Sequence, residues 1–249
     1  MGLIARAFDN DSEPVISDAN FKQIKTFTGE TILYDAISHT YRTLDGQKMT
    51  SGSEYAKQFA KPFNREASLA VCARAWNVRE SLIADIWSMN AEISRGYGTA
   101  LHKALELAHK HYKTGDKIMR VKKSAKDNYA LPKMPHIRRA TELFGKTFGF
   151  GGRPELFVSD VEGLRVGQID RLEIIDDLNK ICRVQDYKTT TKMDKQKILE
   201  YQHQMSFYAD ILAKKGWTVE ALDLFNFDGE NWERIALPVL PYINNKENI

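Results

Sequence analysis

Three short segments with strand character follow one another in the second half of the chain, and they constrain the fold more than any other feature. They run from Glu155 to Asp160, from Leu164 to Ile175 and from Lys180 to Thr189. Glu162-Gly163 and the Asp-Asp-Leu-Asn of residues 176–179 separate them, and both are typical turn sequences. We therefore expect a meander of neighbouring strands at the centre of a sheet.

Helical patterns precede and follow this meander. In residues 91–112, Leu101, Leu105, Ala108 and Tyr112 recur at a spacing of three and four, which is typical of an amphipathic helix. The order is helices, then strands, then a helix and a hairpin around residues 228–231. It predicts an α+β fold: a central mixed, twisted β-sheet flanked by helices, with an N-terminal helical lead-in. Further helices are expected at 65–76, 80–90, 136–148 and 194–215, and extended chain at 26–44.

We expect one domain over residues 1–249, with loosely ordered ends at 1–25 and 244–249. The net charge is only +3, but residues 113–139 hold nine basic and two acidic residues, so the rest of the chain is net acidic. Residues 113–135 are predicted to form a basic loop, since Pro132 and Pro135 interrupt regular structure there. Such a segment fits binding to a polyanion. A merely solvated lysine-rich loop is the alternative.

Several classes of protein are excluded. No apolar run approaches the roughly 18 residues of a membrane span, and the N-terminus is too short in its apolar part for a signal peptide, which predicts a cytoplasmic location. The two cysteines, Cys72 and Cys182, cannot build a four-cysteine zinc or iron–sulfur site. No G-x-x-x-x-G-K-[ST] motif for nucleotide binding is present.

Two aspartates and a lysine form the most informative constellation. Asp186 and Lys188 are two apart on one expected strand, so they share a face, and a short hairpin brings Asp170 close to them. Two carboxylates and water suit a hard cation such as Mg²⁺. A lysine beside it can orient an attacking water and stabilise charge on a phosphorus centre, which favours phosphodiester hydrolysis. The alternative is a salt bridge on an exposed sheet face.

The surrounding sequence resembles a known family. Gly167-Gln-Ile-Asp170-Arg-Leu followed by Asp186-Tyr-Lys188-Thr-Thr is similar to the nuclease domain of the RecB-like branch of the PD-(D/E)XK superfamily. Residues 95–106, with His102, resemble the upstream helix of that branch, and residues 201–208 its downstream Q-x-x-x-Y helix. Residues 39–87 resemble the lead-in of stand-alone, often phage-encoded members. The resemblance covers about 37 to 240.

The resemblance implies roles for the central residues. Asp170 and Asp186 would be metal ligands, with the backbone carbonyl of Tyr187 as a third. Lys188 would be the catalytic lysine. His102 would bind the metal or position a water on it. The alternative for His102 is an ordinary histidine of the helix surface or core.

Further residues are candidates for supporting positions. Glu106 and His109 lie on the same helix face as His102, although both are also compatible with a solvated face. Glu155 is a candidate for an extra carboxylate near the metal. By family analogy, Gln204 and Tyr208 contact DNA or support the active site, and Tyr201 can face the same groove. The alternative places Tyr201 and Tyr208 partly in the core.

The implied function is a Mg²⁺-dependent deoxyribonuclease, with Mn²⁺ able to substitute and no iron–sulfur cluster. We expect an exonuclease rather than an endonuclease, working on DNA in recombination, repair or phage DNA processing. A single-strand-binding or annealing protein is a candidate partner, and no membrane is expected. The alternatives are a catalytically silent nucleic-acid-binding module of the same fold and a nuclease for RNA or branched DNA.

Overall fold

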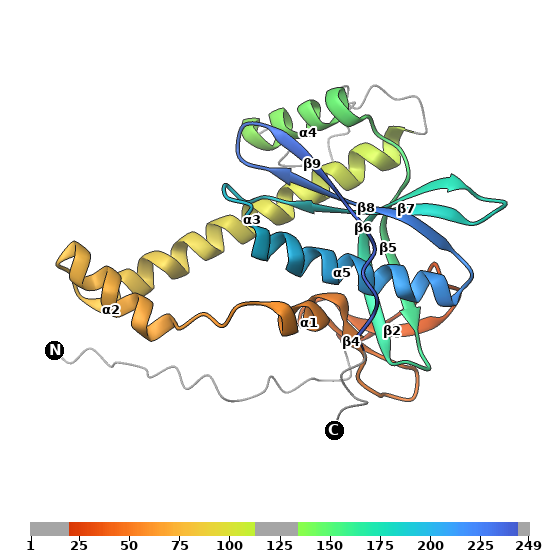
Figure 1. Ribbon diagram of the computed structural model, residues 1–249, viewed down its shortest axis with the longest axis horizontal. Coiled ribbons are helices and arrows are strands. Elements are labelled where there is room, and N and C mark those ends of the chain that lie inside the picture. Colours follow the sequence, from red (N-terminus) through yellow and green to blue (C-terminus); the bar gives the residue numbers. More distant parts are fainter. Residues whose placement is uncertain (1–19, 113–133, 244–249) are drawn as a thin grey trace.

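The computed structural model describes residues 20–112 and 134–243 (Figure 1). The expectations for most of the N-terminal segment, for the basic loop at 113–133 and for the tail from residue 244 therefore lie outside the described residues. Within the N-terminal range expected to be loosely ordered, Lys22–Lys25 instead form strand β1, which pairs with β2. Pro135, expected in the loop, begins helix α4, where a proline at the first position loses no hydrogen bond.

A mixed sheet forms the centre of the molecule, as the sequence predicts. Its order is β4-β6-β7-β8-β9, and β5 pairs with β6. The β5–β6, β6–β7 and β8–β9 ladders are antiparallel, whereas β4–β6 and β7–β8 are parallel. A parallel pair needs a crossover, and helix α5 provides it between β7 and β8. The strands are β4 (Thr50–Ser51), β5 (Arg153–Asp160), β6 (Arg165–Asp176), β7 (Ile181–Lys188), β8 (Thr218–Phe227) and β9 (Trp232–Leu237).

Helices cover the two faces of this sheet (Figure 1). Helix α5 (Lys195–Lys214) begins at Asp194, whose side chain accepts a hydrogen bond from the Lys197 backbone. It packs on one face against a cluster that includes Val184 and Leu222. Helices α3 (Glu80–Tyr112) and α4 (Pro135–Phe148) cover the other face. Removing these apolar side chains from water is the main stabilising term of both layers.

A small N-terminal sheet is fixed to the edge of the central one. It has the order β1-β2-β3, with β2 at Thr31–Asp35 and β3 at Thr40–Arg42. Its loop binds β5 directly: the Phe27 amide donates to the Phe157 carbonyl at 2.7 Å, and the Ser159 amide donates to the Thr28 hydroxyl at 2.9 Å. The chain then forms β4, the short helix α1 (Gly52–Ala56) and a 3₁₀ turn at Lys57–Phe59.

Helices α2 (Arg65–Trp76) and the first half of α3 extend away from the sheet as an arm (Figure 1). The two helices expected at 80–90 and 91–112 are one continuous helix, because nothing at Asn90 or Ala91 stops the backbone hydrogen bonds. Gly96 lies within it without breaking it. Among the described residues, no helix is both long and apolar enough to cross a bilayer.

Candidate active site

The site lies at an interruption in the sheet. On one edge of β6, strand β5 pairs with residues 165–172. On the opposite edge, β4 pairs with Arg165 and Val166, and β7 pairs only from Arg171 onward. No described strand therefore pairs with residues 167–170 on that edge, which we call the open edge. It holds Gly167 and Asp170, the two residues that the G-x-x-D motif singles out.

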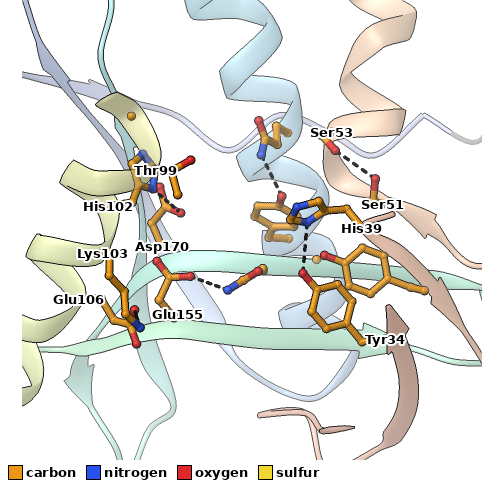
Figure 2. Close-up of a pocket in the computed structure, with 16 residues that line it drawn as sticks. Tyr34, His39, Ser51, Ser53, Thr99, His102, Lys103, Glu106, Glu155 and Asp170 are labelled. Atoms are coloured by element: carbon orange, nitrogen blue, oxygen red, sulfur yellow. Dashed lines mark hydrogen bonds and ion pairs between the residues drawn. The ribbon is translucent and has the colours of Figure 1, made fainter. Parts of the chain in front are cut away.

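At the open edge, the side chain of Asp170 makes a hydrogen bond that a paired strand would otherwise make. Its Oδ2 accepts from the Tyr187 backbone amide at 2.8 Å. Its Oδ1 lies 3.4 Å from Nδ1 of His102 on α3. The carboxylate is thus oriented by β7 on one side and faces the helix on the other, as Figure 2 shows for the pair with His102. The closeness of Asp170 to the D-x-K strand, expected from the hairpin, is present.

Glu155 joins Asp170 and His102 in a cluster. One ligand atom from each of the three lies within 4.8 Å of the others, close enough to hold one metal ion together. Glu155 adopts a positive φ of 52°, an uncommon backbone conformation. It interrupts the β5–β6 pairing opposite Asp170, since the adjacent pairs are Pro154 with Arg171 and Leu156 with Ile169. The side chain of Gln168 donates to its carboxylate.

Asp186 and Lys188 form an ion pair beside this cluster. Nζ of Lys188 lies 2.6 Å from Oδ2 of Asp186, and both side chains are largely buried. The lysine also lies 4.7 Å from the centre of the Tyr201 ring, at cation–π distance. Tyr201, expected to face a substrate groove, therefore contacts the lysine directly. Asp186 is not part of the three-residue cluster.

The electrostatics of the site favour a bound cation. Burial and the neighbouring Asp170 raise the pKa of Glu155 to about 7, and burial raises the pKa of Asp186 to about 6 against the effect of Lys188. Burial would lower the pKa of His102, but Asp170 outweighs it and raises that pKa to about 9. The carboxylates thus outnumber the cations around them. A divalent ion fits this donor set of carboxylates and an imidazole, and would favour ionised carboxylates and a neutral imidazole.

The two other helix residues singled out with His102 have different surroundings. Glu106 pairs with Lys103 at 2.7 Å and with Lys110, and it lines the same pocket as Asp170. His109 is fully buried. Its Nδ1 accepts from the Gly151 amide at 3.0 Å and its Nε2 is 2.9 Å from the Tyr187 hydroxyl.

Burial and the nearby Arg171 lower the pKa of His109 to about 3, so its ring is neutral. Because Nδ1 accepts a hydrogen bond from the Gly151 amide, Nε2 carries the ring hydrogen and donates a hydrogen bond to the Tyr187 hydroxyl. His109 therefore connects α3 to β7 through the residue between Asp186 and Lys188. It supports the backbone that orients Asp170.

Gln204 and Tyr208 fill the open edge from the α5 side. The Gln204 amide donates to the Tyr208 hydroxyl at 2.9 Å. The Tyr208 ring lies against Gly167 and Gly52, where an added Cβ would come within 2.0 Å and 2.2 Å of it. The burial of Tyr208 agrees with the alternative that places it partly in the core, and Tyr208 also lines the pocket beside Gln204, its expected groove partner.

A pocket of about 500 Å³ opens in front of the cluster. Figure 2 shows His102, Glu155 and Asp170 on one side of it and Tyr34, His39, Ser51 and Ser53 on the other. Sequence reasoning did not identify these residues of the small N-terminal sheet and the start of α1 as part of a site. His39, Ser51 and Ser53 lie within the lead-in that resembles the family, and Tyr34 precedes it.

Comparison with known proteins agrees with this geometry. The family model described as "PD-(D/E)XK nuclease superfamily" matches residues 64–233. No curated protein and no solved structure shows significant similarity to the chain. The matched range contains the open edge, the Asp186–Lys188 pair and the helix of His102. On this match the chain belongs to the PD-(D/E)XK nuclease superfamily.

Proposed function

We propose that this nuclease is a divalent-metal-dependent deoxyribonuclease that degrades DNA from its ends. The observation that carries the proposal is the meeting of His102, Glu155 and Asp170 at one point, with the Asp186–Lys188 pair directly beside them. Nucleases of this superfamily generally use divalent metals. A bound Mg²⁺ or Mn²⁺ would supply charge stabilisation for the scissile phosphate and lower the pKa of a water molecule.

The protein's own residues would hold the ion and orient its ligands. Asp170, Glu155 and His102 would hold the ion, with Asp186 completing the set from β7. The Tyr187 amide fixes one oxygen of Asp170, and the other lies beside His102, on the side where the ion would be held. The carbonyl of Tyr187 as a further ligand stays a prediction.

Lys188 would act on the reacting phosphate. Its ammonium group is kept charged: burial would lower its pKa, but Asp186 and Asp170 outweigh burial and raise it. A charged lysine stabilises negative charge on the phosphate oxygens and can orient the attacking water. The Tyr201 ring restricts where the flexible lysine side chain can lie.

The proposed DNA substrate and the proposed exonuclease action rest on the sequence motifs. The G-x-x-D strand, the D-x-K strand and the Q-x-x-x-Y helix together are similar to the RecB-like branch, whose members act in recombination and repair. We infer membership of that branch and a stand-alone, phage-type enzyme from the same motifs. The cytoplasmic location and an annealing or single-strand-binding partner stay predictions.

The test compares substrates for the full chain. End-labelled linear DNA, closed circular DNA and linear RNA of the same sequence are incubated with Mg²⁺ or Mn²⁺. Loss of the linear DNA alone supports the proposal. Cutting of circles would establish an endonuclease, and cutting of RNA alone would replace the substrate. Tight DNA binding without any cleavage would support the silent binding module instead.

A further inference from the structure

The pocket has two chemically different walls. One carries the acidic cluster, where a metal-bound phosphate belongs. The opposite wall carries Tyr34, His39 and Tyr41, which we call the tyrosine wall, and the hydroxyls of Ser51 and Ser53. It comes from residues 34–53, which precede the range that matches the family model.

The tyrosine wall is suited to the uncharged part of a nucleotide. Among its pocket-lining residues there is no lysine or arginine, so it offers a phosphate no strong cationic partner. It offers aromatic rings and hydroxyl groups. Every nucleobase has a flat face that stacks on aromatic side chains, and hydroxyls can bind the edges of a base or a sugar.

The wall is also held rigidly. Tyr34 and Tyr41 stack with their ring centres 4.9 Å apart and nearly parallel, and Phe157 of β5 supports Tyr34 at 5.3 Å. The Tyr34 hydroxyl is 3.1 Å from Nδ1 of His39. The turn before His39 is fixed because Asp35 accepts hydrogen bonds from the Ile37 amide and the Ser38 hydroxyl.

The three residues of the tyrosine wall differ in solvent exposure. Tyr41 is buried, Tyr34 is half-buried and His39 is exposed. Tyr34 and His39 are therefore the residues that a ligand can contact, and Tyr41 and Phe157 support them from behind. Such a preorganised wall loses little side-chain entropy on binding.

The two walls are close enough to act on one nucleotide. Tyr34, His39 and Tyr41 line the same pocket as the acidic cluster. A volume of about 500 Å³ lies within the range of pockets that enclose small ligands, roughly 300–1,000 Å³. A base can enter such a pocket only after it leaves the duplex stack.

We propose that Tyr34 and His39 bind the unpaired base of the nucleotide next to the scissile phosphate, so that the enzyme acts on single-stranded DNA or on a frayed end. This inference rests on the proposed nuclease function and adds a subsite for the substrate to it. The small N-terminal sheet then contributes to substrate selection, while the acidic cluster and Lys188 carry out hydrolysis.

The test measures kcat and KM on three DNAs: a natural single strand, the same strand with abasic residues at its ends, and a blunt duplex. The variants are Tyr34→Leu, which keeps apolar bulk, and His39→Ala. Ile37→Ala is the control, since this exposed residue of the same turn does not line the pocket. Thermal unfolding of each variant confirms that the small sheet is intact.

For wild type we expect KM to be roughly tenfold lower on the natural strand than on the abasic strand, from the usual strength of base stacking. Tyr34→Leu should remove that difference by raising KM with kcat nearly unchanged, and Ile37→Ala should retain it. Equal KM values of wild type for the natural and abasic strands would overturn the inference, as would unchanged discrimination in Tyr34→Leu and His39→Ala. If wild type cleaves no DNA with either metal, the proposed function fails and this inference with it.

Discussion

Gly167 offers a sharp test of how the site is built. A Cβ added at this position would come within 2.0 Å of Cε1 and 2.4 Å of Cδ1 of Tyr208. Ordinary contacts between carbon atoms lie at about 3.5–4.0 Å. The ring cannot simply shift toward α1, because Gly52 is so close to it that a Cβ added there would come within 2.2 Å of the ring. Gly167→Ala should therefore overpack a buried site.

The expected cost of Gly167→Ala is about 3 kcal/mol of unfolding free energy, the upper end of the usual range for overpacking. For a chain of this size that is roughly 6–12 °C in melting temperature. The assay is urea unfolding followed by circular dichroism. Gly96→Ala is the control: it adds the same methyl group to a helix with open space around it, and should be neutral or stabilising.

A double-mutant cycle isolates the contact itself. Tyr208→Leu removes the ring, and in that background Gly167→Ala should cost about 1–2 kcal/mol less than in wild type. The reasoning is refuted if Gly167→Ala costs under about 0.5 kcal/mol, or if its cost is the same with and without the Tyr208 ring.

Three further predictions concern charge, a buried histidine and the metal. Burial would raise the pKa of Asp160, but Lys214 and Arg165 outweigh burial and lower that pKa to about 2. The lowered pKa contributes about 2 kcal/mol of stability, which is present above about pH 4 and lost as the pH falls through about 2. Acid unfolding of Asp160→Asn should lack that pH dependence. His109→Phe removes the partners of Gly151 and Tyr187 and should cost about 1–3 kcal/mol in urea unfolding, so a neutral result would contradict its buried role. Mn²⁺ should raise the melting temperature of wild type but not of Asp170→Asn, and an equal rise in both would place the ion elsewhere.

The strands and helices near the site could be predicted because local signals determine them. The Glu162-Gly163 turn and residues 176–179 mark the boundaries between the three strands of the β5–β7 meander, and the structure has the strands within a residue or two of the expected ranges. Helix α5 follows its Asp194 cap. Sequence reasoning also expected Asp170 beside the D-x-K strand, since one short hairpin connects them.

Other features depend on contacts between distant segments. The open edge arises because β4 and β7 pair with different parts of β6, and no local pattern reports that. The same holds for the role of Gly167, whose neighbour Tyr208 is on a later helix. Helical spacing left His109 open between a supporting position beside His102 and a solvated face, and its partners at Gly151 and Tyr187 make it a buried residue.

The small N-terminal sheet shows most clearly how far the sequence alone predicts the site. The extended character of β2 and β3 is visible in the sequence, whereas the place of the sheet across the pocket depends on hydrogen bonds between Thr28 and Ser159, which are 131 positions apart. The site residues were expected from motifs, and their roles in catalysis stay predictions, as does the single domain over residues 1–249.

The central claim is that Lys188 and the acidic cluster form the active centre of a nuclease. Its most direct test is the single-turnover rate of cleavage of end-labelled linear DNA in Mg²⁺ by wild type, Lys188→Ala and Lys48→Ala. Lys48 is exposed and lies outside the pocket. We predict that wild type and Lys48→Ala cleave the DNA at similar rates. Lys188→Ala should fold normally but cleave at least about a hundredfold more slowly, because it loses one group that stabilises charge in the transition state. Equal rates for Lys188→Ala and wild type would contradict the account.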